Sequence, residues 1–165
     1  MTSYIDKSER ITEGVRKSFH NTDCKMANRS CYGYNSIPGG ELVVNEPEAK
    51  VVRWIFERYL SGDSLGKIAT GLQKRGILSP SGKPNWNREA ISKLLSNEKY
   101  TGSVLLQKTV SVCGAQLKNE GELAQVLIRN HHKAIISNED FAMAQRMKGE
   151  HARSARQEPE MKLSF

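Results

Sequence analysis

The clearest pattern of apolar and polar positions lies between residues 59 and 102, where it predicts two short amphipathic helices. The apolar face of the first has positions spaced i, i+3, i+4 and i+7, which are Leu65, Ile68, Ala69 and Leu72. Ser64 precedes this face as an N-cap, because its hydroxyl can accept a hydrogen bond from a first-turn amide. Gly76 follows it and supplies the left-handed residue at which helices commonly end.

The second predicted helix opens at Asn87, directly after Trp86. Its inner face is apolar and consists of Ile91, Leu94 and Leu95. Its outer face is short, polar and basic and consists of Arg88, Ser92 and Lys93. The connection over residues 77–86 is longer than the three- or four-residue turn of a helix-turn-helix, so the pair is an expanded relative of that design.

Helices are also predicted on both sides of this pair. Residues 2–22 form a mostly polar helix with a thin apolar stripe, whose members are Ile11, Val15 and Phe19. Asn45 precedes a helix with a wide apolar face, formed by Val51, Val52, Ile55, Phe56, Tyr59 and Leu60. Trp54 and Tyr59 could stack on bases, but aromatic residues at helical spacing more often pack in a core. Ser137 opens a last helix, and from residue 151 the pattern is lost, as expected of a linker.

Short strands complete an α+β fold. Residues 32–34 and 42–44 predict two strands around a glycine-rich turn. Residues 100–112 alternate well enough for a further strand, with residues 115–122 as a polar loop that carries Lys118 and residues 126–128 as the returning strand. The expected fold is thus a helical core that contains the expanded helix-turn-helix-like pair, small antiparallel strands and an N-terminal helical arm.

Composition narrows the choice of partners. The formal net charge is +7 and the sequence pI is near 9.4, which favours a polyanionic partner, although many ordinary soluble proteins are also basic. No run of 18 apolar residues and no signal-peptide pattern occurs, so we expect a soluble cytoplasmic protein without membrane contact.

Metal and cofactor sites are not expected. The three cysteines contain no C-x-x-C pair, and the spacing of His20, Cys24 and Cys31 fits no standard ligand pattern. The adjacent His131 and His132 would point to opposite faces of a strand and could not easily share a metal ion. Whether these two histidines contact DNA or only pack stays open.

Two stretches of the chain read G-D-S-L-G-K-I-A-T-G-L-Q-K-R-G-I and S-G-K-P-N-W-N-R-E-A-I-S-K-L-L-S-N-E-K-Y-T-G. They resemble the recombinase domain of large serine recombinases, the phage integrases and mobile-element transposases that use a serine nucleophile. The positions that match the family pattern are Ile68, Ala69, Leu72, Gly76, Ile77, Trp86, Leu95, Asn97, Tyr100 and Gly102. Gln73 departs from the asparagine usual in the family. With Y-G-Y at 32–34 and N-H-H-K-A-I-I-S-N-E-D-F at 130–141, the resemblance covers nearly the whole chain.

The resemblance implies a place in a larger enzyme. Residues 1–23 would be the end of a linker helix from a catalytic domain, residues 24–150 the DNA-binding recombinase domain, and residues 151–165 a linker toward a zinc-binding domain. The alternative for the arm is a solvated, charged helix that frays. The enzyme would act as a homo-oligomer on DNA, with this domain binding double-stranded DNA at an attachment half-site. The catalytic serine would lie outside this chain, since Ser8, Ser64 and Ser92 have capping or surface explanations.

The outer face of the second helix supplies the candidate base contacts. Arginine and lysine can pair with guanine and asparagine with adenine, which points to Asn87, Arg88, Ser92 and Lys93. The candidate phosphate contacts are Arg16, Lys17, Lys74, Arg75, Lys83 and Asn85. Lys74 and Arg75 also lie at a helix end, where cations complement the helix dipole, and both roles can hold at once.

Two functions of other classes compete with this interpretation. A helix-turn-helix transcriptional regulator would also be basic, but it would need a dimerising element within these residues. A self-contained nuclease or other hydrolase would need clustered carboxylates or a His/Cys constellation. Asp6, Asp23, Asp63 and Asp140 are scattered, which makes the hydrolase the weakest of the three.

Overall fold

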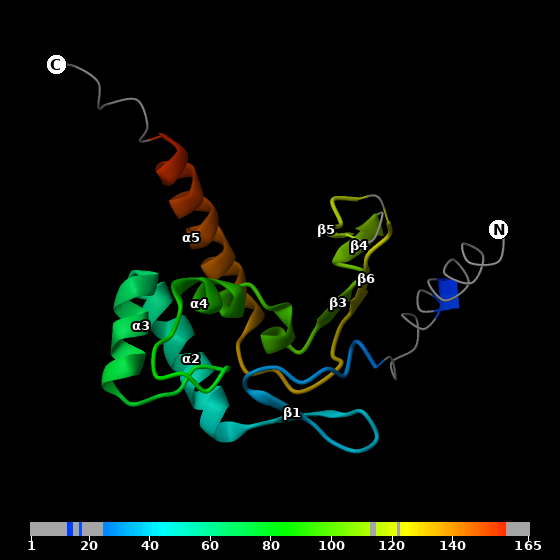
Figure 1. Cartoon of the computed structure of the whole chain (residues 1–165), viewed down its shortest axis with the longest axis horizontal. Helices are drawn as coiled ribbons and strands as arrows, with labels where there is room; N and C mark the ends of the chain where they lie inside the picture. The colour runs from blue at the N-terminus through cyan, green and yellow to red at the C-terminus, as the bar shows by residue number, and fades with distance from the viewer. Residues whose placement is uncertain (1–12, 15–16, 18–24, 113–114, 122, 158–165) are drawn as a thin grey trace.

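The structure is a computed structural model, and it describes residues 13–14, 17, 25–112, 115–121 and 123–157. Most of the arm predicted for residues 1–23 therefore lies outside the described residues. Within them the fold is an α+β mixture, as the sequence predicts, with helices gathered on one side and a narrow β-ribbon projecting on the other (Figure 1).

The helical part follows the predicted order along the chain. Its four α-helices among the described elements are α2 (Glu46–Leu60), α3 (Leu65–Lys74), α4 (Arg88–Leu95) and α5 (Asn138–Gln157), and a short 3-10 helix, η1 (Glu98–Thr101), follows α4. Helix α2 packs against α3, α4 and α5 and is the centre of the helical part. α5 runs on through Gln157, into the segment predicted as a linker from residue 151, and leads away from the other helices (Figure 1).

Capping interactions set most of the helix boundaries. The hydroxyl of Ser64 accepts a hydrogen bond from the amide of Lys67 at 3.3 Å, as predicted. Gly76, with φ of +67°, ends α3 in the predicted left-handed conformation. Asn45 does occupy the N-cap position of α2, but its side chain makes no capping hydrogen bond.

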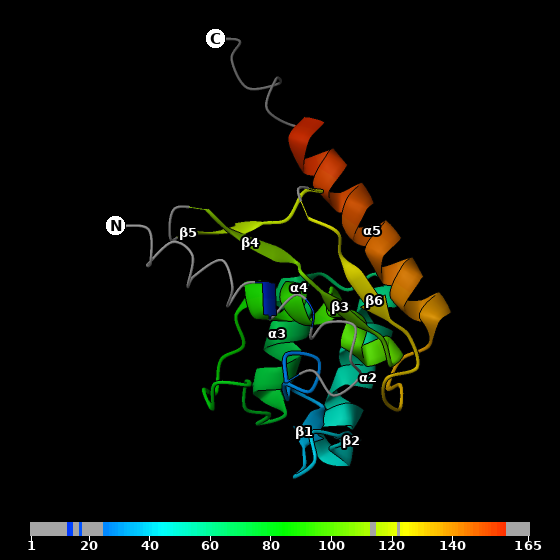
Figure 2. The same ribbon diagram turned by 90° about the vertical axis from the view of Figure 1, so that its right-hand side faces the viewer.

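The strands among the described residues form three separate antiparallel pairs. The predicted pair around the glycine-rich turn is present as β1 (Tyr34–Ser36) and β2 (Leu42–Val44). The second is β3 (Val104–Leu106) with β6 (Val126–Ile128), and the third is β4 (Thr109–Val112) with β5 (Ala115–Lys118). The last two pairs form the projecting ribbon (Figure 2).

Two predictions about the ribbon were wrong. The strand does not begin at residue 100, because Tyr100 lies in η1 and its ring is buried in the helical core. Residues 115–118 are a strand and not part of a polar loop. The buried Asn119 explains the second error, because its amide nitrogen donates to the carbonyls of Gln107 at 2.7 Å and Leu123 at 2.8 Å. These bonds hold the end of β5 against the start of β4.

One main hydrophobic core joins the helices to the first strand pair. Its largest fully buried side chains come from β1, α2, α3, α4 and η1: Tyr34, Tyr100, Phe56, Ile55, Ile68, Leu72, Ile91, Leu95 and Val52. Tyr59 is buried and Trp54 is partly buried against the same cluster, which supports packing over base stacking for both. Val104 and Leu106 belong to a smaller cluster beneath the ribbon, together with Ala27.

Candidate nucleic-acid interface

The connection between α3 and α4 is ordered by hydrogen bonds that fix where α4 begins. The indole nitrogen of the buried Trp86 donates to the carbonyl of Ile77 at 2.9 Å. Ser79 and Lys83 form a closed turn, in which the Ser79 amide donates to the Lys83 carbonyl at 2.8 Å and the Lys83 amide donates to the Ser79 hydroxyl at 3.1 Å. This longer connection thus holds α3 and α4 in a defined relation, as a short turn would.

The exposed face of α4 carries the candidate base contacts. Arg88 and Lys93 are exposed and Ser92 is partly buried, while Ile91, Leu94 and Leu95 face the core. Asn87 is the N-cap, and its side-chain oxygen accepts a hydrogen bond from the Glu89 amide at 2.9 Å. Its amide nitrogen is the group left to donate outward, whereas recognition of adenine by asparagine uses both side-chain groups.

Glu89 also lies on this exposed face, although sequence reasoning left it out. Its carboxylate pairs with the ammonium group of Lys93 at 2.8 Å, with both side chains exposed. The hydrogen bond from Lys93 is the main cause that lowers the pKa of Glu89. An exposed pair of this kind contributes little stability, so Lys93 can exchange this partner for another anion at small cost.

Arg88 is placed by a contact with α3. A Cβ atom added to Gly66 would lie 3.1 Å from a terminal nitrogen of the Arg88 guanidinium, so the guanidinium lies directly over that glycine. Any larger residue at position 66 would push Arg88 away from α3. The Arg88 side chain thus lies against α3, while Ile91, Leu94 and Leu95 pack α4 into the core.

Lys74 and Arg75, the predicted phosphate contacts at the end of α3, have different surroundings. Lys74 is exposed and makes no ion pair with any residue the structure describes. The guanidinium carbon of Arg75 lies 4.5 Å from the centre of the Trp54 ring, which is a cation–π contact. Gly71 allows Trp54 to reach this position, since a Cβ there would lie 2.9 Å from the ring.

Two more cations that the sequence did not single out lie near the start of α3, namely Arg58 near the end of α2 and Lys67 in the first turn of α3. The buried carboxylate of Asp63 pairs with Arg58 at 2.5 Å and with Lys67 at 2.6 Å. Hydrogen bonding to Lys67 is the first cause of a pKa of Asp63 below its ordinary value. Spacing alone suggests the Asp63–Lys67 pair, four residues apart on the sequence, whereas the contact with Arg58 depends on the turn between α2 and α3.

The remaining candidate phosphate contacts lie either in the connection before α4 or in the N-terminal arm. Lys83 and Asn85 are exposed in the connection before α4, close in sequence to the base-contact candidates. Lys17 pairs with Glu13 at 3.0 Å, and both side chains are exposed. Arg16 lies outside the described residues. The interface that can be described is thus formed by α3, the connection and α4.

A model of the family described as Recombinase matches residues 46–150, which is most of the chain and includes the whole described interface. The chain belongs to the recombinase family. The predicted resemblance to the recombinase domain of large serine recombinases is thereby confirmed.

Two solved structures share the fold of this recombinase chain. One is the crystal structure of an LSR–DNA complex, with a TM-score of 0.61 and 22% identity, over 91% of this chain and 41% of that one. The other comes from work on the sequence requirements of the Listeria innocua prophage attP site, with a TM-score of 0.62 and 21% identity, over 93% of this chain and 57% of that one. The recombinase chain thus spans about half the length of the structures it matches.

The two histidines left open by the sequence are held together beside the core of this recombinase domain. The Nε2 atom of His132 lies 2.6 Å from the carbonyl of Lys99, so Nε2 carries the proton and donates. The Nδ1 atoms of His131 and His132 are 3.0 Å apart, so His131 donates to the unprotonated Nδ1 of His132. The His132 ring also meets Tyr34 edge to face, with centroids 4.7 Å apart. His132 is therefore a packing residue.

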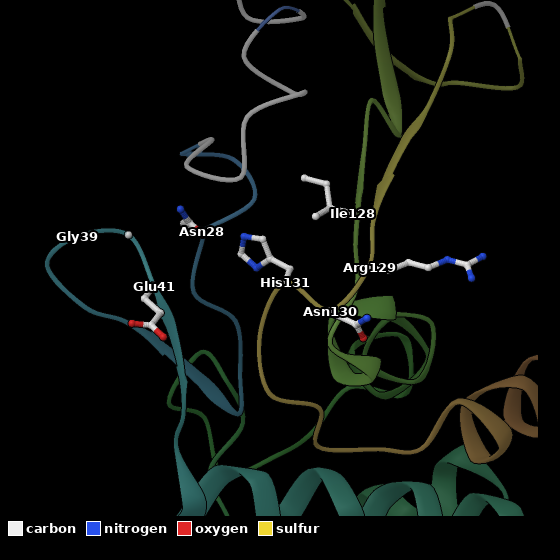
Figure 3. A pocket seen from close by; sticks show the side chains of 8 residues that line it. Asn28, Gly39, Glu41, Ile128, Arg129, Asn130 and His131 are labelled. Atoms are coloured by element: carbon white, nitrogen blue, oxygen red, sulfur yellow. The ribbon is translucent and has the colours of Figure 1, made fainter.

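A polar hollow lies next to His131, between the β1–β2 turn and the segment after β6. Its lining includes Asn28, Gly40, Glu41, Asn130 and His131. In Figure 3 the His131 ring lies between Asn28 and Ile128, and the side chain of Arg129 points away from it. No cluster of three metal-ligating side chains occurs among the residues the structure describes. None of the described helices is long and apolar enough to cross a membrane.

Proposed function

We propose that this recombinase domain binds double-stranded DNA in a sequence-specific manner and holds a serine site-specific recombinase on its attachment half-site. The observation that carries the proposal is the exposed, charged face of α4, which the ordered connection holds beside α3, with the Arg88 guanidinium lying over Gly66. An α-helix with its side chains is about 10–12 Å across, which suits a major groove about 12 Å wide.

Base reading is assigned to α4. Arg88 can donate to the two acceptors of guanine in the major groove, and Lys93 can donate to guanine once it leaves Glu89. Glu89 can accept from the amino group of cytosine, which adds a contact to the four proposed from the sequence. Asn87 and Ser92 contribute less, because the oxygen of Asn87 is used as a cap and Ser92 is partly buried.

Phosphate binding is assigned to the cations around α4. Lys74 and Lys83 are exposed and make no ion pair among the described residues, so they can neutralise phosphates without breaking a contact. Arg75 would exchange its contact with Trp54 for a phosphate, or keep both. Asn85 can donate to a phosphate oxygen, and Arg16 and Lys17 would add contacts from the arm.

The proposal extends to the whole recombinase. One similar structure is described as a complex with DNA, which supports double-stranded DNA as the partner of this domain too. Within the full enzyme this domain carries no catalytic serine; it sets register, while strand cleavage belongs to a separate catalytic domain and oligomerisation to the assembled protein on DNA. Residues 1–23 are assigned to the connecting arm and residues 151–165 to the linker on the other side.

The decisive experiment is a selection from a random duplex library with the purified chain, followed by titration of the enriched duplex at several salt concentrations. We expect one short site to be enriched and its binding to weaken steeply with salt. Arg88→Ala should relax the choice of base at one position and lower affinity for the enriched duplex by about tenfold or more. Lys83→Ala should weaken enriched and scrambled duplexes alike and flatten the salt dependence.

The matched control is Lys50→Ala, which removes an exposed lysine from α2 outside this interface. It should leave both affinities unchanged. Steep salt dependence without an enriched site would mean phosphate contact only and would refute base reading by α4. Nicking of plasmid by the chain alone would refute the non-catalytic role.

A further inference from the structure

Helix α4 has only eight residues, so the partners of its last carbonyls matter to its stability. The last four carbonyls of an α-helix have no partner within the helix. Two of them are satisfied by the following turn, because the Ser96 amide donates to the Lys93 carbonyl at 3.2 Å and the Asn97 amide donates to the Leu94 carbonyl at 3.1 Å. The Ser92 carbonyl accepts from the hydroxyl of Ser96 at 3.1 Å, which leaves the Leu95 carbonyl without a partner in this turn.

Side chains of α5 bond to the Leu95 carbonyl and add a second donor at the Ser92 carbonyl. The ammonium group of Lys148 donates to the Ser92 carbonyl at 2.8 Å and also bonds to the hydroxyl of Ser96. The side-chain amide of Gln145 donates to the Leu95 carbonyl at 2.7 Å. Gln145 and Lys148 are three residues apart and so share one face of α5. Two side chains from one helix thus hold the end of another.

The charge of Lys148 suits this position. Its ammonium group lies at the negative end of the α4 dipole. Lys148 is partly buried, and burial lowers its pKa. It makes no ion pair with the described residues, so its hydrogen bonds go to the end of α4 and not to a carboxylate.

α5 is itself fixed firmly enough to serve as a support. The Ser137 hydroxyl caps its first turn by accepting from the Asp140 amide at 3.1 Å. Ala144, in the same part of the helix, is fully buried. Farther along, the Nδ1 atom of His151 lies 3.3 Å from the Tyr59 hydroxyl of α2. The clamp formed by Gln145 and Lys148 lies between these contacts.

We propose that Gln145 and Lys148 are positioning residues that set the orientation of the DNA-reading face of α4. This inference rests on the proposed function. The Asn87 cap and the Trp86 hydrogen bond fix the start of α4, and the clamp holds its last turn. Without the clamp the last turn frays and the helix pivots about its first turn, so the spacing between Arg88 and Lys93 no longer matches the bases. Neither positioning residue is proposed to contact DNA.

The test compares Lys148→Met with Lys148→Arg and with the double variant Gln145→Leu/Lys148→Met. Methionine keeps the packing of the lysine stem and removes the donor, whereas arginine keeps both charge and donors. For each variant we would measure affinity for the enriched duplex and for a scrambled duplex at one salt concentration, together with hydrogen exchange of the α4 amides in the free protein.

Lys148→Met should lower affinity for the enriched duplex by about tenfold, the order of one lost base contact, and affinity for the scrambled duplex by less than about twofold. Lys148→Arg should keep the wild-type ratio of the affinity for the enriched duplex to that for the scrambled duplex. The double variant should lower this ratio further than Lys148→Met does. Exchange at the end of α4 should quicken in Lys148→Met and stay slow in Lys148→Arg. Lys50→Met controls for the loss of one positive charge and should change neither affinity.

Failure of the positioning role can be distinguished from failure of the proposed function. An unchanged ratio in Lys148→Met, or an equal loss on both duplexes, would overturn the positioning role, since an equal loss indicates a direct phosphate contact. If the wild-type chain enriches no duplex, the proposed function fails and the orienting role fails with it. Exchange of the α4 amides then still decides whether the clamp holds the helix end, and unchanged exchange would overturn that as well.

Discussion

The rings of Tyr34 and Tyr100 lie stacked in the core, with centroids 6.2 Å apart, and their hydroxyls bond to different segments. Tyr34 donates to the carbonyl of Lys133 at 2.7 Å, and Tyr100 donates to the carbonyl of Tyr32 at 2.8 Å. Burial raises the pKa of both hydroxyls, so both remain donors at neutral pH. The pair therefore joins β1, η1 and the segment before α5.

Tyr100→Phe should lower the free energy of unfolding by about 1–3 kcal/mol, because it leaves the Tyr32 carbonyl without its partner inside the protein. The measurement is urea unfolding, with a lower midpoint and an unchanged slope. Tyr59→Phe is the matched control. Its hydroxyl meets the exposed His151 at 3.3 Å, so its loss should cost less than about 0.5 kcal/mol. Equal losses in the two variants would contradict this difference.

Gly71→Ala should destabilise the chain by about 1–3 kcal/mol, because the new methyl group would lie 2.9 Å from Trp54. Gly149→Ala makes the same change in α5, where nothing lies within 4 Å of the new atom. That variant should gain about 0.5–1 kcal/mol from helix propensity. Thermal unfolding of both variants tests the contrast, and a stabilised Gly71→Ala would show that Trp54 moves aside freely.

Glu89→Gln should tighten binding to a scrambled duplex by about threefold at low salt, since it removes a negative charge beside DNA and frees Lys93. The gain should shrink as salt rises. Glu150→Gln, on the exposed surface of α5, removes the same charge away from the proposed interface and should have no effect. Unchanged binding by Glu89→Gln would mean that this face of α4 does not approach DNA.

Acidification should destabilise the chain through His132. Burial holds the pKa of His132 below its ordinary value of 6.5, so the unfolded chain binds this proton more readily than the folded one. The contribution of this group is thus unchanged above about pH 6.5 and falls as pH drops below that value. His131 and Lys99, both nearby, also disfavour a cation at His132.

The measurement is urea unfolding of wild type and His132→Gln at pH 7.5 and 5.5. Glutamine can still donate to the Lys99 carbonyl but does not titrate in this range. The loss of stability between the two pH values should therefore be smaller in the variant. An equal loss would assign the pH dependence to other groups.

Local signals in the sequence were enough for the α3–α4 unit. Ser64, Gly76 and Asn87 act within their own turns, and the apolar spacing around them is regular, so the bounds of both helices could be predicted. The ribbon was less predictable because its order depends on distant partners. Tyr100 alternates correctly for a strand, yet burial against Tyr34 places it in η1. The strand β5 depends on the bonds of Asn119, which no short pattern indicates.

In the candidate site, too, local features could be predicted from the sequence and contacts between distant segments could not. The exposure of Arg88 and Lys93 follows from helical spacing, and the structure agrees. The roles of Gly66 beneath Arg88 and of Lys148 beside Ser92 depend on how α3, α4 and α5 meet, which spacing within one helix does not contain. The last turns of α5 were missed because the apolar period fades there, although His151 still contacts Tyr59 of α2.

The contact between Arg75 and Trp54 also makes the emission of Trp54 sensitive to what Arg75 binds. The chain contains two tryptophans, and Trp86 is buried, while Trp54 is partly exposed beneath a guanidinium. A phosphate that draws Arg75 from the ring changes the surroundings of one indole and leaves the other as an internal reference. Arrival of a polyanion at the end of α3 can thus be followed by tryptophan emission, without attaching a dye.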